Sequence, residues 1–120
     1  MSDRFIPPDD ITPAEFFTSW VPLAVARDPS RSARLGAAPH ALEFTLEGEG
    51  GGVFGVHIAD GAVRGSVGAL EHADLRVRLD VETWRALNRG DMSAPEAFLK
   101  RRVHLKGSLI LAVKLHVILG

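Results

Sequence analysis

GDMSAPEAFLKRRVHLKGSLILAVKLHVILG, residues 90–120, is the stretch that decides the fold, because it carries more apolar surface than its own short elements can cover. Ser93 and Glu96 stand three positions apart ahead of an apolar run, and this capping-box pattern predicts the start of a short helix. Val103 and Leu105 then alternate with polar residues, which is the period of a strand with one buried face. The stretch is therefore expected to form a helix, a strand and a final helix.

The final helix, expected over residues 109–119, presents two apolar faces. Its polar residues are Lys114 and His116, which at helical spacing lie on nearly opposite sides. One face holds Leu109, Ile110, Val113 and Val117, and the other holds Leu111, Ala112, Leu115, Ile118 and Leu119. A helix packed on a sheet needs only one apolar face. The second face must meet another element, such as a helix near the N-terminus, another chain or an apolar ligand.

Upstream of this stretch, apolar residues alternate with polar ones and predict four more strands. Two of them, over residues 41–47 and 53–58, flank a glycine-rich hairpin turn. Asp60 and Gly61 predict a second hairpin, which leads into a third strand over residues 62–67. The inward residues of the fourth strand are Leu75, Val77 and Leu79.

The segment after the fourth strand sets the fold class. Asp80 is placed to cap a helix over residues 81–89, and Gly90 is placed to end it. Because the strands are linked by hairpins and the helices gather at the two ends of the chain, the sequence predicts an α+β fold. The sheet is expected to have five strands and to be mainly antiparallel, with helices on one face and solvent on the other.

The N-terminal part is expected to hold an extended lead, a helix and a loop. Residues 1–11 contain two prolines and no apolar period, so they predict a lead into a single domain over residues 12–120. Thr12, Pro13 and Glu15 mark the start of a helix. Its apolar stripe consists of Phe16, Phe17, Trp20, Val21 and Ala24.

Pro22 interrupts this helix, because it cannot donate a backbone hydrogen bond and clashes with the preceding turn. The helix is therefore expected to kink or stop near Val21. Residues 28–39 are rich in turn formers and small side chains, which predicts a linker or mobile loop. The kinked helix ahead of this loop is a candidate gate.

Composition narrows the functional classes. The chain has 120 residues, which suits one domain, and its formal net charge of -1 gives no reason to expect a nucleic-acid partner. The absence of Cys excludes thiol nucleophiles and thiolate metal sites. The N-terminus lacks the apolar run of a signal peptide, and the longest apolar stretch is shorter than the about 20 residues that span a bilayer. A cytoplasmic location is expected.

The polar residues give little support for catalysis. The 5 histidines show no repeated metal-ligand spacing, so neither a metal nor another cofactor is predicted. His57 and Asp60 are close in sequence, but a strand-and-turn pair of this kind is usually structural. A small hydrolase or isomerase acting on a lipid stays open as an alternative, although it lacks a candidate base other than His57. The chain is expected not to be an enzyme.

Residues 95–115, PEAFLKRRVHLKGSLILAVKL, resemble the C-terminal signature of the sterol carrier protein type 2 family. The order of elements from about Ala41 onward also resembles that family. The paired Arg101 and Arg102 are similar to its bacterial branch, which assists quinone biosynthesis. The resemblance implies an apolar tunnel between the sheet and the helices, and a carrier that performs no reaction.

The predicted function is non-enzymatic binding and transfer of a hydrophobic ligand, whether fatty acyl, sterol-like or isoprenoid. The residues expected to line the site are Phe16, Phe17, Trp20, Val21, Phe44, Phe54, Val56, Trp84, Leu87, Phe98, Leu109, Ile110, Val113 and Val117. Few polar groups are expected inside, so the site would recognise length and bulk. Transient contact with membranes is predicted through an outward basic patch of Arg76, Arg78, Arg102, His104 and Lys106.

The alternative prediction is an accessory or scaffold protein. Its spare apolar helix face, Leu111, Leu115 and Ile118, would form a homodimer or dock on enzymes of lipid or quinone synthesis.

Overall fold

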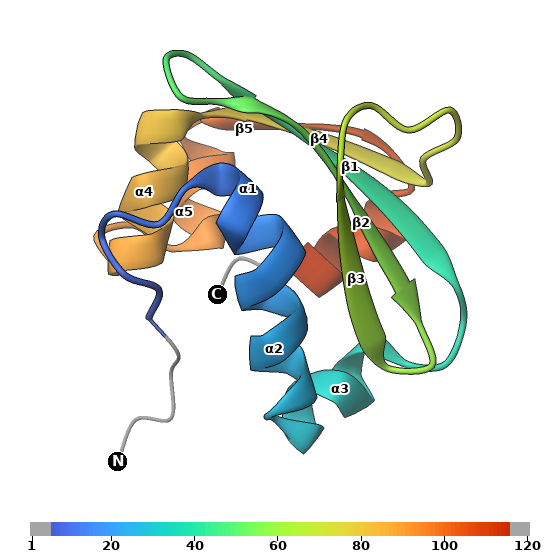
Figure 1. Cartoon of the computed structure of the whole chain (residues 1–120). Helices are drawn as coiled ribbons and strands as arrows, with labels where there is room; N and C mark the ends of the chain where they lie inside the picture. The colour runs from blue at the N-terminus through green and yellow to red at the C-terminus, as the bar shows by residue number, and fades with distance from the viewer. Residues whose placement is uncertain (1–5, 116–120) are drawn as a thin grey trace.

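The computed structural model describes residues 6–115, except for the side chain of Val113. Its sheet has the strand order β3-β2-β1-β4-β5, and β1 and β4 are parallel while the other neighbours are antiparallel (Figure 1). The five-stranded, mainly antiparallel α+β fold is therefore confirmed. The strands are β1 (His40–Glu47), β2 (Gly52–Ala59), β3 (Ala62–Val67), β4 (Leu75–Asp80) and β5 (Val103–Gly107).

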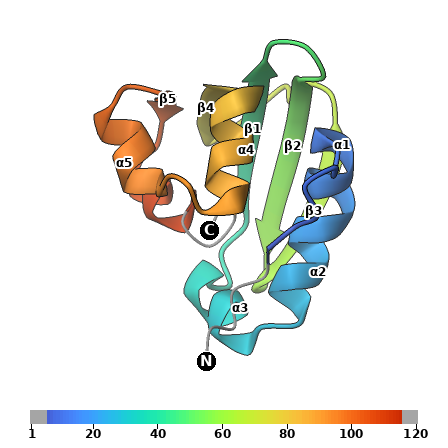
Figure 2. The same cartoon turned by 90° about the vertical axis from the view of Figure 1, so that its left-hand side faces the viewer.

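The alternating pattern places the core on one face of the sheet. Leu42, Phe44 and Leu46 of β1 are buried, and so are Leu75, Val77 and Leu79 of β4. The helices cover this face, with α4 (Val81–Arg89) in front of β4 and β1 and with α1 (Pro13–Glu15) and α2 (Val21–Ala26) in front of β3 (Figure 2).

The N-terminal helix starts as predicted but does not stop at Val21. The Thr12 side chain accepts a hydrogen bond from the Glu15 N–H, and the Glu15 side chain accepts one from the Thr12 N–H. Between α1 and α2 the chain forms a π-helix, η1 (Phe16–Trp20), in which the Val21 N–H bonds the Phe16 carbonyl. Pro22 has no N–H to donate, so the wider π turn lets the helix continue past it to Ala26.

This helix packs on the sheet without an intervening side chain at Gly65 of β3. A Cβ built on Gly65 would lie 1.9 Å from the Phe17 carbonyl oxygen and 2.9 Å from the Thr18 Cα. Only glycine permits so close an approach of helix backbone to strand.

The prediction of a loop over residues 28–39 is wrong for most of that range, because α3 (Pro29–Leu35) forms there. The Asp28 side chain caps it by accepting hydrogen bonds from the N–H groups of Ser30 and Arg31, and Pro29 occupies the first turn. Leu35 is fully buried and holds the helix against the core.

The next helices follow the predicted signals. Asp80 caps α4 by accepting a hydrogen bond from the Thr83 N–H, and Gly90 ends it in the left-handed conformation at φ 80°. Ser93 caps α5 (Ala94–Leu99).

The final helix differs from the prediction in geometry and orientation. Residues 109–114 form a 3₁₀-helix, η2 (Leu109–Lys114), and the part of the prediction from residue 116 onward, with His116, Val117, Ile118 and Leu119, lies outside the described residues. Leu111 and Leu115 are buried, whereas Leu109 is 66% exposed and Ile110 is 82% exposed. The face expected to be spare is therefore in the core.

Lys114 explains this orientation. Its Nζ donates hydrogen bonds to the carbonyls of Arg34 and Leu35, at the end of α3. Positions three apart share a face of a 3₁₀-helix. Anchoring Lys114 on α3 therefore also turns Leu111 into the core.

Candidate functional site

A row of aromatic rings runs from α4 through η1 to the sheet. The Trp84 and Phe16 ring centroids are 5.3 Å apart, and those of Phe16 and Phe17 are 5.0 Å apart, both edge to face. Phe17 then meets Phe44 at 4.8 Å and Phe54 at 5.2 Å. Because η1 is a π-helix, two consecutive phenylalanines both point into the interior.

Most of the predicted lining residues belong to one apolar cluster around this row. Its members among the predicted lining are Phe16, Phe17, Val21, Phe44, Phe54, Val56, Trp84 and Leu87, and Trp20 packs against it while partly exposed. The structure brings these side chains together between the sheet and the helices. A role in ligand binding stays a prediction.

The remaining predicted lining residues are placed differently. Phe98 is 52% exposed at the end of α5, and Leu109 and Ile110 lie on the outer side of η2. Expecting these three in the interior was wrong. The anchor at Lys114 turns Leu109 and Ile110 outward, and Phe98 lies on the outer side of α5, a helix that buries Ala97 instead. The side chain of Val113, like Val117, lies outside what the structure describes.

Two buried hydrogen-bond donors lie on the inner face of α4. The sequence analysis identified neither side chain as a buried donor. Trp84 is fully buried and Asn88 is 8% exposed. Neither the Trp84 Nε1 nor the Asn88 Nδ2 has a hydrogen-bond partner in the part of the chain that the structure describes. The sequence does contain a signal for the role of Asn88. It lies about one helical turn after Trp84, so it extends the apolar stripe that Trp84 and Leu87 form on one face of the helix.

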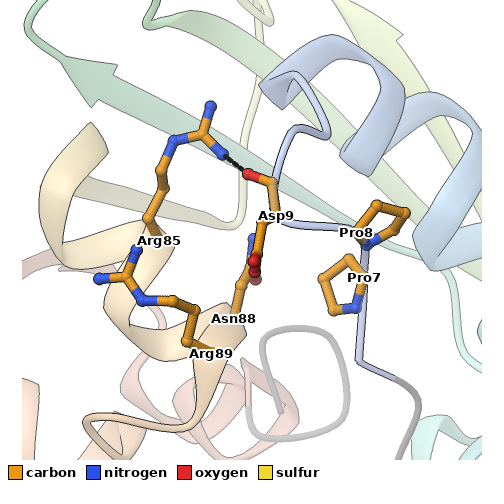
Figure 3. A pocket seen from close by; sticks show the side chains of 6 residues that line it. All are labelled: Pro7, Pro8, Asp9, Arg85, Asn88 and Arg89. Atoms are coloured by element: carbon orange, nitrogen blue, oxygen red, sulfur yellow. Dashed lines mark hydrogen bonds between the residues drawn. The ribbon is translucent and has the colours of Figure 1, made fainter.

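Asn88 lines a small hollow between α4 and the N-terminal lead, shown in Figure 3. The other lining residues are Pro7, Pro8, Asp9, Arg85 and Arg89. Its free volume is about 10 Å³, which is room for about one water molecule.

Arg85 lines this hollow and also contacts the aromatic row. It donates hydrogen bonds to the backbone carbonyls of Asp9, at 2.9 Å, and Ile11, at 3.2 Å, and so ties the lead to α4. Its Cζ also lies 5.1 Å from the Trp84 ring centroid.

A second surface groove lies on the other side of the lead. Its lining residues are Pro8, Asp10, Ile11, Glu15, Ser19, Trp20 and Leu23. Leu23 is 48% exposed there, so the outer side of the N-terminal helix presents apolar surface to solvent.

The basic patch lies together on the outer face of β4 and β5, as the sequence analysis expected. Arg76 pairs with Lys106 and Arg78 with His104 across the two strands. The neighbouring strand offsets part of the charge, because Glu43 lies 3.4 Å from Arg76 and Glu47 lies 3.5 Å from Arg78. A membrane-docking role stays a prediction.

Arg102, the fifth residue of the basic patch, is tied to the start of α4. Its Nε donates a hydrogen bond to the Thr83 hydroxyl at 2.9 Å, and its guanidinium lies 3.9 Å from the Asp80 carboxylate. Hydrogen bonds from the side chain and backbone N–H of Thr83, together with the Arg102 charge, hold the pKa of Asp80 below its ordinary value. Arg102 and Asp80 thus stabilise the start of the helix that carries Trp84 and Asn88.

His57, the candidate base of the enzyme alternative, lies on the face of the sheet opposite to the aromatic row. The His57 Nε2 lies 3.4 Å from the Ser66 hydroxyl on the outer face of the sheet. No group of three potential metal ligands occurs within residues 6–115. In the same range, no helix has the length and apolar character needed to cross a bilayer.

Comparison with known proteins gives a family match and several similar folds. The model of the SCP-2 sterol transfer family matches residues 23–120. No curated protein sequence matches the chain.

The first of three similar solved structures is the sec-alkylsulfatase Pisa1 from Pseudomonas sp., with a TM-score of 0.70 and 21% identity. The match covers 92% of this chain and 16% of the sulfatase, so the chain corresponds to a small part of that enzyme.

The other two are small proteins of comparable length. Palmitated SCP2L2 from Aedes aegypti has a TM-score of 0.66 and 18% identity, covering 88% of this chain and 92% of that one. The ubiquinone synthesis protein UbiJ-SCP2 has a TM-score of 0.61 and 12% identity, covering 84% and 87%. These similarities confirm the fold, and the family match over residues 23–120 identifies the chain as a member of the SCP-2 sterol transfer family.

Proposed function

We propose that the chain, acting as one domain over residues 12–120, carries a lipid with a long alkyl tail, held between the sheet and the helices without being chemically changed. The observation that carries this proposal is the family match, which covers β1–β5 and the helices α3, α4 and α5. The aromatic row supports it, because it supplies a continuous apolar wall from α4 to the sheet. The palmitated state of the Aedes aegypti protein is consistent with an acyl ligand.

The strength of binding follows from the apolar area. Each buried methylene contributes about 0.8 kcal/mol, so burying the roughly 16 methylenes of a stearoyl tail gives about 13 kcal/mol before costs. Lost freedom on association removes several kcal/mol of this. Dissociation constants in the micromolar range are expected.

Ligand entry requires an opening, because the aromatic row is closely packed in this structure. The N-terminal helix is the proposed gate. It contacts the sheet through backbone at Gly65, and its π segment carries Phe16 and Phe17. Lifting this helix would remove two rings from the row and expose the interior.

A titration with a fluorescent stearic acid derivative tests the proposal. Saturable binding of one ligand per chain, with a micromolar dissociation constant, is the expected result. Phe44→Ala serves as the site variant, and Arg64→Gln, exposed on the outer face of β3, serves as the control. Absence of saturable binding by the wild-type protein would contradict the carrier function.

The accessory role is a second candidate, favoured by the exposed Leu109 and Ile110 and by the similarity to UbiJ-SCP2. In this reading, η2 docks on a second copy or on an enzyme of lipid or quinone synthesis through these two side chains. Size-exclusion chromatography with light scattering distinguishes the two occupants. A dimer that Ile110→Glu converts to a monomer supports self-association, whereas a monomer in both forms excludes the homodimer.

A further inference from the structure

Strand β5 forms an open edge of the sheet. It is the last strand in the order β3-β2-β1-β4-β5, and within the described chain it pairs only with β4 (Figure 2). An edge strand presents backbone N–H and C=O groups that no neighbouring strand has bonded, and an extended segment of another chain can pair with them. The register with β4 shows which residues of β5 present these groups.

The backbone groups of β5 point alternately toward β4 and away from it. The Ser108 N–H donates to the Asp74 carbonyl at 2.8 Å, one position beyond the paired residues of the two strands. Because residues of an antiparallel strand bond their neighbour in alternation, the backbone groups of Lys106 and His104 also face β4. The groups that face outward belong to Val103, Leu105 and Gly107. None of these three has a backbone hydrogen bond to another segment of residues 6–115.

The outer side of β5 carries basic side chains. His104 and Lys106 are exposed there, and Arg102 precedes them at the same spacing. Arg102 lies 3.9 Å from the Asp80 carboxylate, whereas Lys106 has no carboxylate within 4.0 Å among the described residues. A strand added beside β5 would place its own outward side chains about 4.5–5.5 Å from these basic residues.

The acidic residues of the outer face stand farther from the open edge. Glu43 and Glu47 belong to β1, which is two strands away from β5, and they pair with arginines of β4. Asp74 turns its carboxylate to β1, where it accepts a hydrogen bond from the Ala41 N–H. A segment that pairs with β5 therefore meets basic side chains first.

The inner side next to this edge is apolar and incompletely covered. Leu105 is only partly buried, although its cross-strand partner Val77 is 1% exposed. Two helices, α5 and η2, contact β5. Of the seven large apolar side chains that are exposed in the described chain, these two helices carry four: Phe98, Leu99, Leu109 and Ile110. The opposite edge strand, β3, carries one, Val67, so exposed apolar surface concentrates beside β5.

We propose that β5 accepts an extended segment of a partner protein as a sixth strand of the sheet, and that acidic and apolar residues alternate in this segment. Its acidic side chains would face Arg102, His104 and Lys106, and its apolar side chains would pack beside Leu105. A second copy of β5 does not fit, because antiparallel pairing of identical strands would set basic side chains opposite each other, which is destabilising. The inference concerns the edge of the sheet and does not depend on the carrier function.

Fluorescence anisotropy with a labelled peptide tests the charge preference. The probe is a fluorescein-labelled peptide in which Glu alternates with Val, and the comparison peptide has Lys in place of Glu. The Glu peptide should bind saturably, one per chain, and the Lys peptide about tenfold more weakly, because like charges oppose each other across the strand pair.

Two charge reversals on the protein locate the preference. Lys106→Glu should weaken the Glu peptide about fivefold, since it replaces an attraction across the strand pair by a repulsion. Arg64→Glu is the matched control, because it makes the same change in net charge on the outer face of β3, the other edge strand. It should leave the affinity unchanged.

Two further measurements test pairing through the backbone. N-methylation of the Val amides of the peptide blocks an antiparallel pair and N-methylation of the Glu amides blocks a parallel pair, so one of the two should abolish binding. Hydrogen exchange followed by NMR should show added protection on peptide binding at the outward amides of Val103, Leu105 and Gly107. The amides of His104 and Lys106 face β4 and should change little.

Several results would overturn the strand-pairing site. They are no saturable binding of the Glu peptide, equal binding of the two peptides, or binding that neither methylation reduces. Protection of the three outward amides in free protein with the mass of two chains would assign the edge to a second copy. If vesicles of phosphatidylserine and phosphatidylcholine bind in a way that Lys106→Glu weakens, while the peptide does not bind, the partner of this edge is a membrane.

Discussion

Gly65→Ala should detach the N-terminal helix from the sheet. The new Cβ would lie 1.9 Å from the Phe17 carbonyl oxygen, and an ordinary contact needs about 3.4 Å, so the helix or the strand must shift by about 1.5 Å. A gap of 0.5–1 Å already forfeits about a quarter to a half of a dispersion contact. The shift affects the contacts of Phe16, Phe17 and Val21, so a loss near the upper end of the about 1–3 kcal/mol typical of overpacking is expected.

Gly55→Ala is the matched control. Gly55 lies on the neighbouring strand, and its new Cβ would point to the outer face, 2.6 Å from the Leu70 Cδ2 and from the Ser66 Oγ. Both atoms are at the ends of side chains and can move, whereas the Phe17 backbone cannot. Neither glycine has a positive φ, so Ala suits both backbones.

Urea unfolding followed by circular dichroism measures the two variants against the wild-type protein. Gly65→Ala should lose about 3 kcal/mol and Gly55→Ala less than about 1 kcal/mol. If the two substitutions cost the same, or if Gly65→Ala costs nothing, the direct contact between helix backbone and strand is refuted. The gate assigned to this helix would then lose its structural basis.

Three further substitutions test local claims by the free energy of unfolding. Asp80→Ala should cost about 1 kcal/mol at neutral pH, because the carboxylate caps α4. The pKa of Asp80 is lowered in the folded state, so this contribution is present above the ordinary value of 3.8 and should vanish as the pH falls through the lowered pKa. A difference in unfolding free energy between wild type and Asp80→Ala that stays constant across the pH series would contradict this. Lys114→Met should cost about 1.5 kcal/mol by removing the hydrogen bonds to the end of α3, and protection of α3 amides from hydrogen exchange should fall with it; unchanged exchange would refute the anchor. Leu111→Ala should cost about 2–5 kcal/mol because Leu111 is buried, and Ile110→Ala should cost less than about 0.5 kcal/mol because Ile110 is exposed. If thermal or urea unfolding gives the reverse order, η2 is oriented as the sequence analysis expected.

The sheet and its inward face were predictable because strand periodicity is a local signal. Leu42, Phe44 and Leu46 alternate with polar residues, and such alternation requires that one face be buried. The parallel register of β1 and β4, which places Arg76 beside Glu43, emerges from the structure. The helix caps at Thr12 and Asp80 were also local signals, and the structure confirms both.

The orientation of η2 could not be predicted because it depends on a remote contact. Periodicity assigned two apolar faces but contained no information on which one meets the sheet. Lys114 decides this by binding carbonyls at the end of α3, a helix 79 positions earlier in the chain. That helix was itself missed, because the small residues of its segment outweighed the Asp28 and Pro29 start signal.

The candidate site was predictable only in its apolar part. Bulky side chains at helical spacing placed Phe16, Phe17 and Trp84 in the interior, where they form the aromatic row. The polar part, at Asn88, was missed because a single Asn on a helix is usually exposed, and its lack of a partner emerges only from the packing around it.

The central claim is that the interior of this fold holds a lipid, and native mass spectrometry tests it most directly. The protein would be purified without detergent, measured intact, and then extracted with organic solvent to identify what it released. We predict an added mass of one lipid per chain, released by extraction and identified as a fatty acid. Protein of unliganded mass that also fails to take up palmitate on incubation would contradict the account.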